Sequence, residues 1–177
     1  MFGKKDRTKE ILDSIWDEDY RVVAAGEDAP SKSWLKGYVK ENGFKLPKEY
    51  ISHAANFYSG LYVEVNEEVW PRAEEFSVAP FWSFLYGVFS YAFNEESPEW
   101  MNADIARKEF QELGHDVLPI LKVIGDADVY CLDKSGSILK WSHELDELDQ
   151  FEGSFFDLLR LELSELSERK RRKVESL

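Results

Sequence analysis

Residues 129–142 read VYCLDKSGSILKWS, and this stretch decides the fold. The letters VYCL and ILKWS are rich in apolar and β-forming side chains, whereas DKSG between them is typical of a turn. The pattern predicts an antiparallel hairpin inside one sheet. Downstream, Ser154 and Asp157 have the spacing of a capping box, which predicts a helix that packs on that sheet.

Outward from the hairpin, helical and strand-like patterns alternate. Gly87 is a candidate bulge in a long strand or bent pair, and Pro119 indicates a sheet edge or a strand start. The order does not repeat βαβ units, so the predicted fold class is α+β, a single domain with a mostly antiparallel central sheet flanked by helices. The expected helices are 8–16, 32–41, 47–58 and 98–113 with Ser97 as the cap, and the further strands are 61–66, 81–93 and 117–124.

One domain accounts for the chain, because no linker-like segment and no internal repeat divides it. We expect an N-terminal helix and irregular lead-in over 1–30, the α+β domain over 31–168, and a basic tail with the character of a frayed helix end over 169–177. The positive charges within residues 1–7 precede acidic residues instead of an apolar segment, so no secretory signal is predicted. The apolar stretch 80–93 is too short and too aromatic to cross a membrane.

The charge of the chain indicates the kind of partner. It has 22 Lys and Arg against 35 Asp and Glu, a net charge of −13. Binding to phosphates depends on Lys and Arg, so nucleic acid and anionic membranes are disfavoured and a basic protein partner is expected. The single cysteine, Cys131, cannot close an internal disulfide and has apolar neighbours, which predicts a buried thiol and a cytoplasmic protein.

Catalytic and metal-binding patterns each fail at a named residue. His143-Glu144 has Glu147 where a zinc helix needs a second histidine, and the segment starting at Asp126 lacks the ligands and the glycine of a calcium loop. Asp126 and Asp128 could form a phosphatase-type pair, although two turn-forming aspartates are the favoured interpretation. Cys131 could pair with a histidine, but an apolar strand disfavours its thiolate. We therefore expect no enzyme, no cofactor and no metal.

Carboxylates gather on segments predicted to be surface. The partner-binding residues that we predict are Glu64, Glu67, Glu68, Glu144, Asp146 and Glu147. A third group, Glu95, Glu96 and Glu99, lies around the start of the helix predicted at 98–113. A solvated face is the alternative for each group taken alone. The tryptophans Trp70, Trp82, Trp100 and Trp141 are either core residues or interface anchors, with the core preferred for Trp141.

An ordered set of motifs over residues 34–163 resembles the SUKH superfamily, whose namesakes include the yeast cell-wall assembly regulators. The set comprises Leu46-Pro47 before a helix, the hairpin ending in Trp141 and His143-Glu144, and Ser154-Phe155 at the start of a leucine-rich helix. The resemblance implies an α+β domain that binds proteins. Bacterial members include immunity proteins that neutralise toxins, often nucleases, whereas eukaryotic members act as regulatory scaffolds. The family offers no catalytic motif to transfer, and residues 65–94 are longer and more aromatic than its pattern.

Charge and resemblance together predict a non-enzymatic immunity protein of the cytoplasm. Such a protein would occupy the cationic, phosphate-binding groove of a toxin nuclease domain. The main alternative is a regulatory or scaffold module that binds a cellular partner without any toxin. A hydrolase that uses Asp126 and Asp128 is the weakest alternative.

Overall fold

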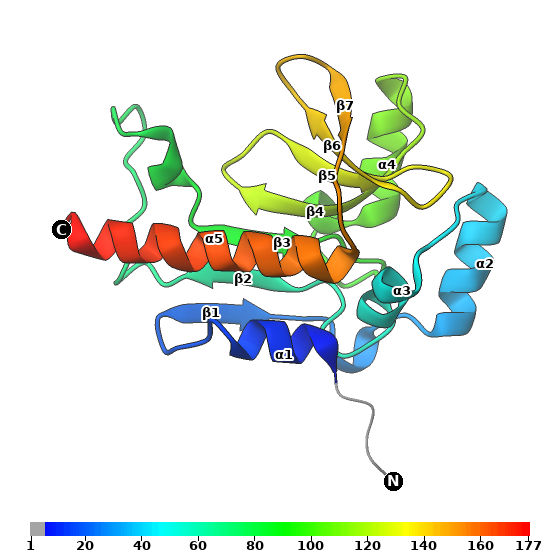
Figure 1. The fold of residues 1–177 in the computed structure, drawn as a ribbon, viewed down its shortest axis with the longest axis horizontal. Helices are drawn as coiled ribbons and strands as arrows, with labels where there is room; N and C mark the ends of the chain where they lie inside the picture. Colours follow the sequence, from blue (N-terminus) through cyan, green and yellow to red (C-terminus); the bar gives the residue numbers. More distant parts are fainter. Residues whose placement is uncertain (1–5) are drawn as a thin grey trace, which may run out of the picture.

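The computed structural model describes residues 6–177, and the prediction of an α+β fold with an antiparallel sheet is confirmed. Its strands follow one another in chain order across a single sheet (Figure 1). The strands are β1 Tyr20–Val23, β2 Tyr62–Val65, β3 Gly87–Ser90, β4 Leu118–Ile124, β5 Val129–Leu132, β6 Ile138–Ser142 and β7 Glu147–Gln150. The α-helices are α1 Arg7–Asp13, α2 Lys32–Asn42, α3 Lys48–Ala54, α4 Ala103–Glu112 and α5 Phe155–Glu175. Residues 1–5, which carry part of the predicted N-terminal segment, lie outside the described residues.

The predicted hairpin is formed by β5 and β6. Leu132 pairs with Ile138 at the turn, and Val129 pairs with Trp141 at the other end. The Asp133 carboxylate accepts hydrogen bonds from the backbone N–H groups of Ser135 at 2.8 Å and Ser137 at 2.9 Å. These bonds satisfy the donors of the turn locally, which is why this short segment could be predicted from its sequence.

Helix α5 crosses one face of the sheet (Figure 1). The predicted capping box starts it, because Ser154 accepts from the backbone of Asp157 while the Asp157 side chain accepts from the backbone of Ser154. The Tyr130 hydroxyl of β5 donates to buried Glu162 at 2.7 Å and ties the helix to the sheet. The basic run expected to be a frayed end continues the helix instead, with buried Lys170 forming ion pairs to Asp17 and Asp19.

The opposite face of the sheet is covered by a helix over only part of its width. Tyr130 points to α5, and successive side chains of a strand alternate, so Val129 points to the opposite face. Trp141 is the cross-strand partner of Val129 and points to that opposite face as well. The ring of Phe110 on α4 meets Trp141 edge to face at 5.0 Å, which places α4 on this second face. The part formed by β1 to β3 is lined by aromatic side chains and is described below.

The segment 81–93 differs from the sequence prediction. Residues 81–93 form a 3₁₀ helix, Phe81–Phe84, and the short strand β3, because Pro80 and the Ser83 hydroxyl start a helical turn. Gly87 is paired regularly with Ile124 and is not a bulge; a Cβ there would lie 2.7 Å from the Val63 carbonyl oxygen. Pro119 is the second residue of β4, which agrees with the predicted strand start, and the register of the pairing with β5 shifts directly after it.

Helix α4 starts later than predicted, and two edge strands add to the sheet. Its cap is Asn102, which accepts from the backbone N–H of Asp104 at 3.0 Å, whereas Ser97 donates to the Asn94 carbonyl and caps no helix. The additional strands are β1, within the lead-in, and β7, within the acidic segment after the hairpin. Strand β7 buries none of its side chains and β1 buries only Tyr20, so neither has the buried alternation of β2.

Candidate protein-interaction surfaces

The first predicted acidic cluster, Glu64, Glu67 and Glu68, contains one carboxylate in ion pairs and two exposed carboxylates. Glu64 points away from the side of Val63 and Val65, as predicted, but its carboxylate accepts hydrogen bonds from the Tyr62 hydroxyl at 2.7 Å, Arg72 at 3.2 Å and Arg21 at 3.3 Å. Its side chain is only 13% exposed. Glu64 therefore holds two arginines on the sheet, whereas Glu67 and Glu68 lie exposed in the following turn.

Glu67 and Glu68 open a long connection between β2 and β3 whose tip is apolar. Phe76, which is 93% exposed, and the fully exposed Val78 project from it, and we call residues 66–86 the apolar loop. Glu74 and Glu75 lie exposed beside this tip. The exposed tip thus combines apolar side chains with carboxylates.

The apolar loop is anchored in the core by Trp70. This side chain is buried, and its indole N–H donates to the Ser83 carbonyl at 3.0 Å. The ring of Trp82, half-buried, meets Trp70 at 6.2 Å and lies under the guanidinium of Arg172. Trp70 is a core residue rather than an exposed interface anchor, and Trp141 is buried as predicted.

The second acidic cluster occupies the turn between β6 and β7. The Asp146 carboxylate accepts from the ring nitrogen of His115 at 2.6 Å and from the Trp141 indole at 2.9 Å. The hydrogen bond with His115, followed by that with Trp141, holds the pKa of Asp146 below its usual range. Asp146 therefore stabilises the turn, while Glu144 and Glu147 are exposed on either side of exposed Leu145.

Both clusters lie at the same end of the sheet but on separate strands. In an antiparallel sheet ordered as in the chain, β2, β4 and β6 all finish at one end, where β3, β5 and β7 begin. Strands lie about 4.8 Å apart, so the clusters after β2 and β6 are at least about 19 Å apart, and the twist of the sheet separates them further (Figure 1). We call this end of the sheet, together with the apolar loop and the turns 125–128 and 143–146, the acidic end.

Asp126 and Asp128 lie between the two clusters in the turn from β4 to β5. Asp126 accepts from the backbone N–H of Asp128 at 3.0 Å. Asp128 accepts from the backbone N–H of His143 at 3.0 Å and pairs with Lys140 at 3.3 Å. These are the contacts of turn-forming aspartates, the interpretation favoured by the sequence.

A groove that the sequence analysis missed follows the face opposite α5. Trp100, which is 57% exposed, meets the rings of Tyr62 at 6.0 Å and Phe89 at 5.2 Å edge to face. Trp100 and Tyr62 separate two hollows, one of about 550 Å³ over Phe89 and one of about 370 Å³ toward Asn94. The signal in the sequence was the third acidic group together with Trp100.

The groove continues past Trp100 to a second exposed tryptophan. Trp34 of α2 is 47% exposed, stacks on Tyr38 at 5.5 Å with an interplanar angle of 14°, and meets Phe93 at 5.7 Å. A hollow of about 460 Å³ beside Trp34 is also lined by the carboxylates of Asp28, Glu95 and Glu96. The surface from Tyr62 through Trp100 to Trp34 is the aromatic groove.

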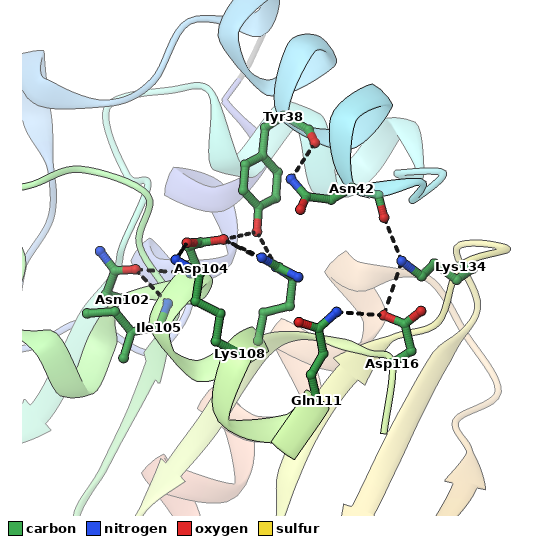
Figure 2. Close-up of polar contacts among 10 residues, drawn as sticks. Tyr38, Asn42, Asn102, Asp104, Ile105, Lys108, Gln111, Asp116 and Lys134 are labelled. Carbon is green, nitrogen blue, oxygen red and sulfur yellow. Dashed lines mark hydrogen bonds and ion pairs between the residues drawn. The ribbon is translucent and has the colours of Figure 1, made fainter. Parts of the chain in front are cut away.

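A partly buried polar network fixes the Trp34 end of this groove. Figure 2 shows Tyr38 reaching from α2 toward Asp104 on α4, whose carboxylate accepts from the Tyr38 hydroxyl at 3.0 Å. Buried Arg107 donates both to Asp104, at 2.9 Å, and to the Tyr38 hydroxyl, at 3.0 Å. Burial, followed by the contact with Asp104, raises the pKa of Tyr38. The network joins α2 to α4 and holds the ring on which Trp34 stacks.

The Cys131 thiol is expected to remain unlabelled by a thiol reagent in the native protein and to react fully after unfolding. It is buried in β5 as predicted, and burial raises its pKa, so little reactive thiolate forms. Labelling with a chromogenic disulfide, with and without denaturant, measures this directly. Prompt reaction of the folded protein would contradict the assignment and revive the pairing of Cys131 with a histidine.

Comparisons with protein-family models, curated proteins and solved structures find no match for this chain.

Within residues 6–177, no group of three or more His, Cys, Asp or Glu side chains is arranged to hold a metal ion. In the same range, no helix has both the length and the apolar character needed to span a bilayer.

Proposed function

We propose that this chain is a non-enzymatic protein-binding module that acts in the cytoplasm as an immunity protein and neutralises a cationic, nuclease-type toxin domain. The observation that carries the proposal is the composition of the acidic end. Exposed Phe76, Val78 and Leu145 project there among exposed carboxylates. Protein interfaces combine an apolar centre with a polar rim. Exposed apolar side chains beside carboxylates therefore favour contact with a basic protein.

The net charge of −13 supports the same kind of partner. A nuclease presents Lys and Arg to phosphates. Carboxylates at the acidic end would pair with those Lys and Arg side chains in place of the phosphates. Complementary charge raises the association rate and leaves the lifetime of the complex to the buried contacts. The resemblance of residues 34–163 to the SUKH superfamily supports the proposal independently of charge.

Charge reversal at the acidic end is expected to slow association with the toxin about tenfold at low salt. The partner to use is the product of the adjacent gene, after co-expression has shown that this chain rescues growth. The variants are Glu67→Lys with Glu68→Lys, and Glu144→Lys with Glu147→Lys. Glu64 and Asp146 stay unchanged because both hold structural hydrogen bonds. Stopped-flow or surface-based kinetics measure the rates.

The matched control is Glu109→Lys with Glu112→Lys, which makes the same change of charge at exposed positions on α4. We expect it to affect the association rate far less than either acidic-end variant. Phe76→Ser with Val78→Ser should instead shorten the lifetime of the complex while leaving the free energy of unfolding unchanged, since both side chains are exposed. Absence of rescue and of a complex would reject the toxin as the partner. Equal rates for all charge variants would reject the acidic end as the site.

A further inference from the structure

The aromatic groove has the form of a site for an extended chain. Its hollows are continuous, because Tyr62 and Trp100 line the first two, and Asp28 and Glu96 line both the second and the one beside Trp34. Trp34 in turn lines the next hollow, of about 490 Å³, over Tyr38. A surface that runs past two exposed tryptophans suits a peptide segment better than a compact small molecule.

The hollow beside Trp34 offers an aromatic face and carboxylates and has no Lys or Arg in its lining, whereas Arg21, Lys122, Arg107 and Lys108 line the neighbouring hollows. Away from Trp34 the protein covers aromatic rings with its own cations. Arg72 lies 3.7 Å from the centroid of Tyr86, at the other end of the groove, and Arg172 lies 5.1 Å from that of Trp82. Among residues 6–177, no cation lies over Trp34 or Trp100, and no ion pair is formed by Asp28, Glu95 or Glu96. Charge complementarity therefore calls for a cationic side chain from a partner.

We propose that the aromatic groove binds an extended segment of a basic partner protein and holds an arginine of that segment over Trp34, against Asp28, Glu95 and Glu96. The flat guanidinium stacks on an indole while its N–H groups donate to carboxylates, a combination that a lysine ammonium matches less well. Trp34 is pre-organised for this role. Tyr38 covers one face of its ring, so the exposed part remains for a ligand.

This inference rests on the proposed function only in requiring a basic protein partner. The groove begins beside the acidic end, because Gly125, Asp126 and Ala127 line its first hollow, but the hollow beside Trp34 is lined by none of the residues of that end. Groove and acidic end can be tested separately because their carboxylates come from different segments, 28 and 95–96 against 67–68 and 144–147. If the groove variants show that no peptide binds there, the role of the acidic end in toxin binding can still be tested, and the reverse also holds.

The experiment titrates the full chain with a synthetic nine-residue peptide that carries one central arginine among glycine and serine. The same peptide with citrulline, which keeps the shape without the charge, is the ligand control. Indole N–H signals in heteronuclear NMR spectra report the six tryptophans separately once each is assigned by substitution. The arginine peptide is expected to shift the Trp34 signal. Trp16 is an internal control because it is 48% exposed, close to the 47% of Trp34, but lies outside the groove.

Removing the groove charges should weaken peptide binding about tenfold. The variant is Glu95→Gln with Glu96→Gln, and its matched control is Glu144→Gln with Glu147→Gln at the acidic end, which should bind the peptide like the unaltered protein. A Trp34 signal that stays fixed would overturn the proposal, as would a citrulline peptide that binds equally well. Equal weakening by both double variants would also overturn it, because it would indicate attraction by net charge alone.

Discussion

Trp70→Ala is expected to lower the free energy of unfolding by about 3–5 kcal/mol, the usual range for truncation of a buried aromatic side chain. Trp70 is among the largest fully buried side chains, and its indole N–H donates to the Ser83 carbonyl. Truncation removes the apolar contacts, leaves a cavity and deprives a carbonyl of its donor. Denaturation by urea, followed by circular dichroism, measures the change.

The control for Trp70→Ala is Trp16→Ala, which removes an equally large side chain from an exposed position. We expect that variant to lower stability by about 1 kcal/mol, clearly less than Trp70→Ala, because about half of the Trp16 side chain lies in solvent. Trp70→Phe should fall between the two, because it keeps most of the ring volume but loses the hydrogen bond to Ser83. If Trp70→Ala unfolded at the same urea concentration as Trp16→Ala, the apolar loop would not be anchored as described.

Local chemistry explains which parts of the fold could be predicted. The hairpin turn is held by the Asp133 side chain and the start of α5 by Ser154 and Asp157, all within a few residues of the bonds they form. Burial of Cys131 follows from its apolar neighbours. Such features require no knowledge of the distant chain, so their sequence signals are reliable.

Tertiary contacts explain what could not be predicted. Strand β1 is a strand because Tyr20 pairs with Val65, 45 positions further on. The aromatic residues of 81–93 favour a strand by propensity, but Trp82 is used in a 3₁₀ helix that packs on Trp70. Propensity reports how well a side chain fits a sheet and is overridden when another buried surface accepts it.

The candidate sites show the same division. Composition indicated the exposed acidic groups, but the pairing of Glu64 with Arg21 and Arg72 depends on strand register and on the fold of the apolar loop. The aromatic groove could not be predicted because its parts meet only in the folded chain. Glu95 and Glu96 come from the segment before α4, whereas Trp34 comes from α2.

Acid is expected to destabilise the protein steeply through His53, between about pH 6.5 and pH 3. The imidazole is buried, with Nδ1 bonded to the Thr8 hydroxyl at 3.0 Å and Nε2 to the Ser90 hydroxyl at 2.8 Å. Its ring also lies 4.7 Å from that of Phe155. Burial in this site lowers the pKa of His53 to about 3, because the charged ring would lose its hydration.

The sign follows from proton binding in the two states. Below its ordinary pKa of about 6.5, His53 binds a proton in the unfolded chain but stays neutral in the folded one until about pH 3. Proton binding therefore stabilises the unfolded state. As the pH falls through this window, His53 lowers the free energy of unfolding by up to about 1.4 kcal/mol per pH unit. Above pH 6.5 the contribution is flat.

Two measurements test His53 separately from the carboxylates that also titrate in acid. His53→Gln, whose amide can still bond to Thr8 and Ser90, should show a shallower fall in unfolding free energy between pH 7 and pH 5 than the unaltered protein. If this variant does not fold, NMR of the native protein decides, because the ring signal of His53 should stay constant down to pH 5. Titration of that signal near pH 6.5 would show that the ring is hydrated, and the link between α1, α3 and β3 through Thr8, His53 and Ser90 would then be wrong.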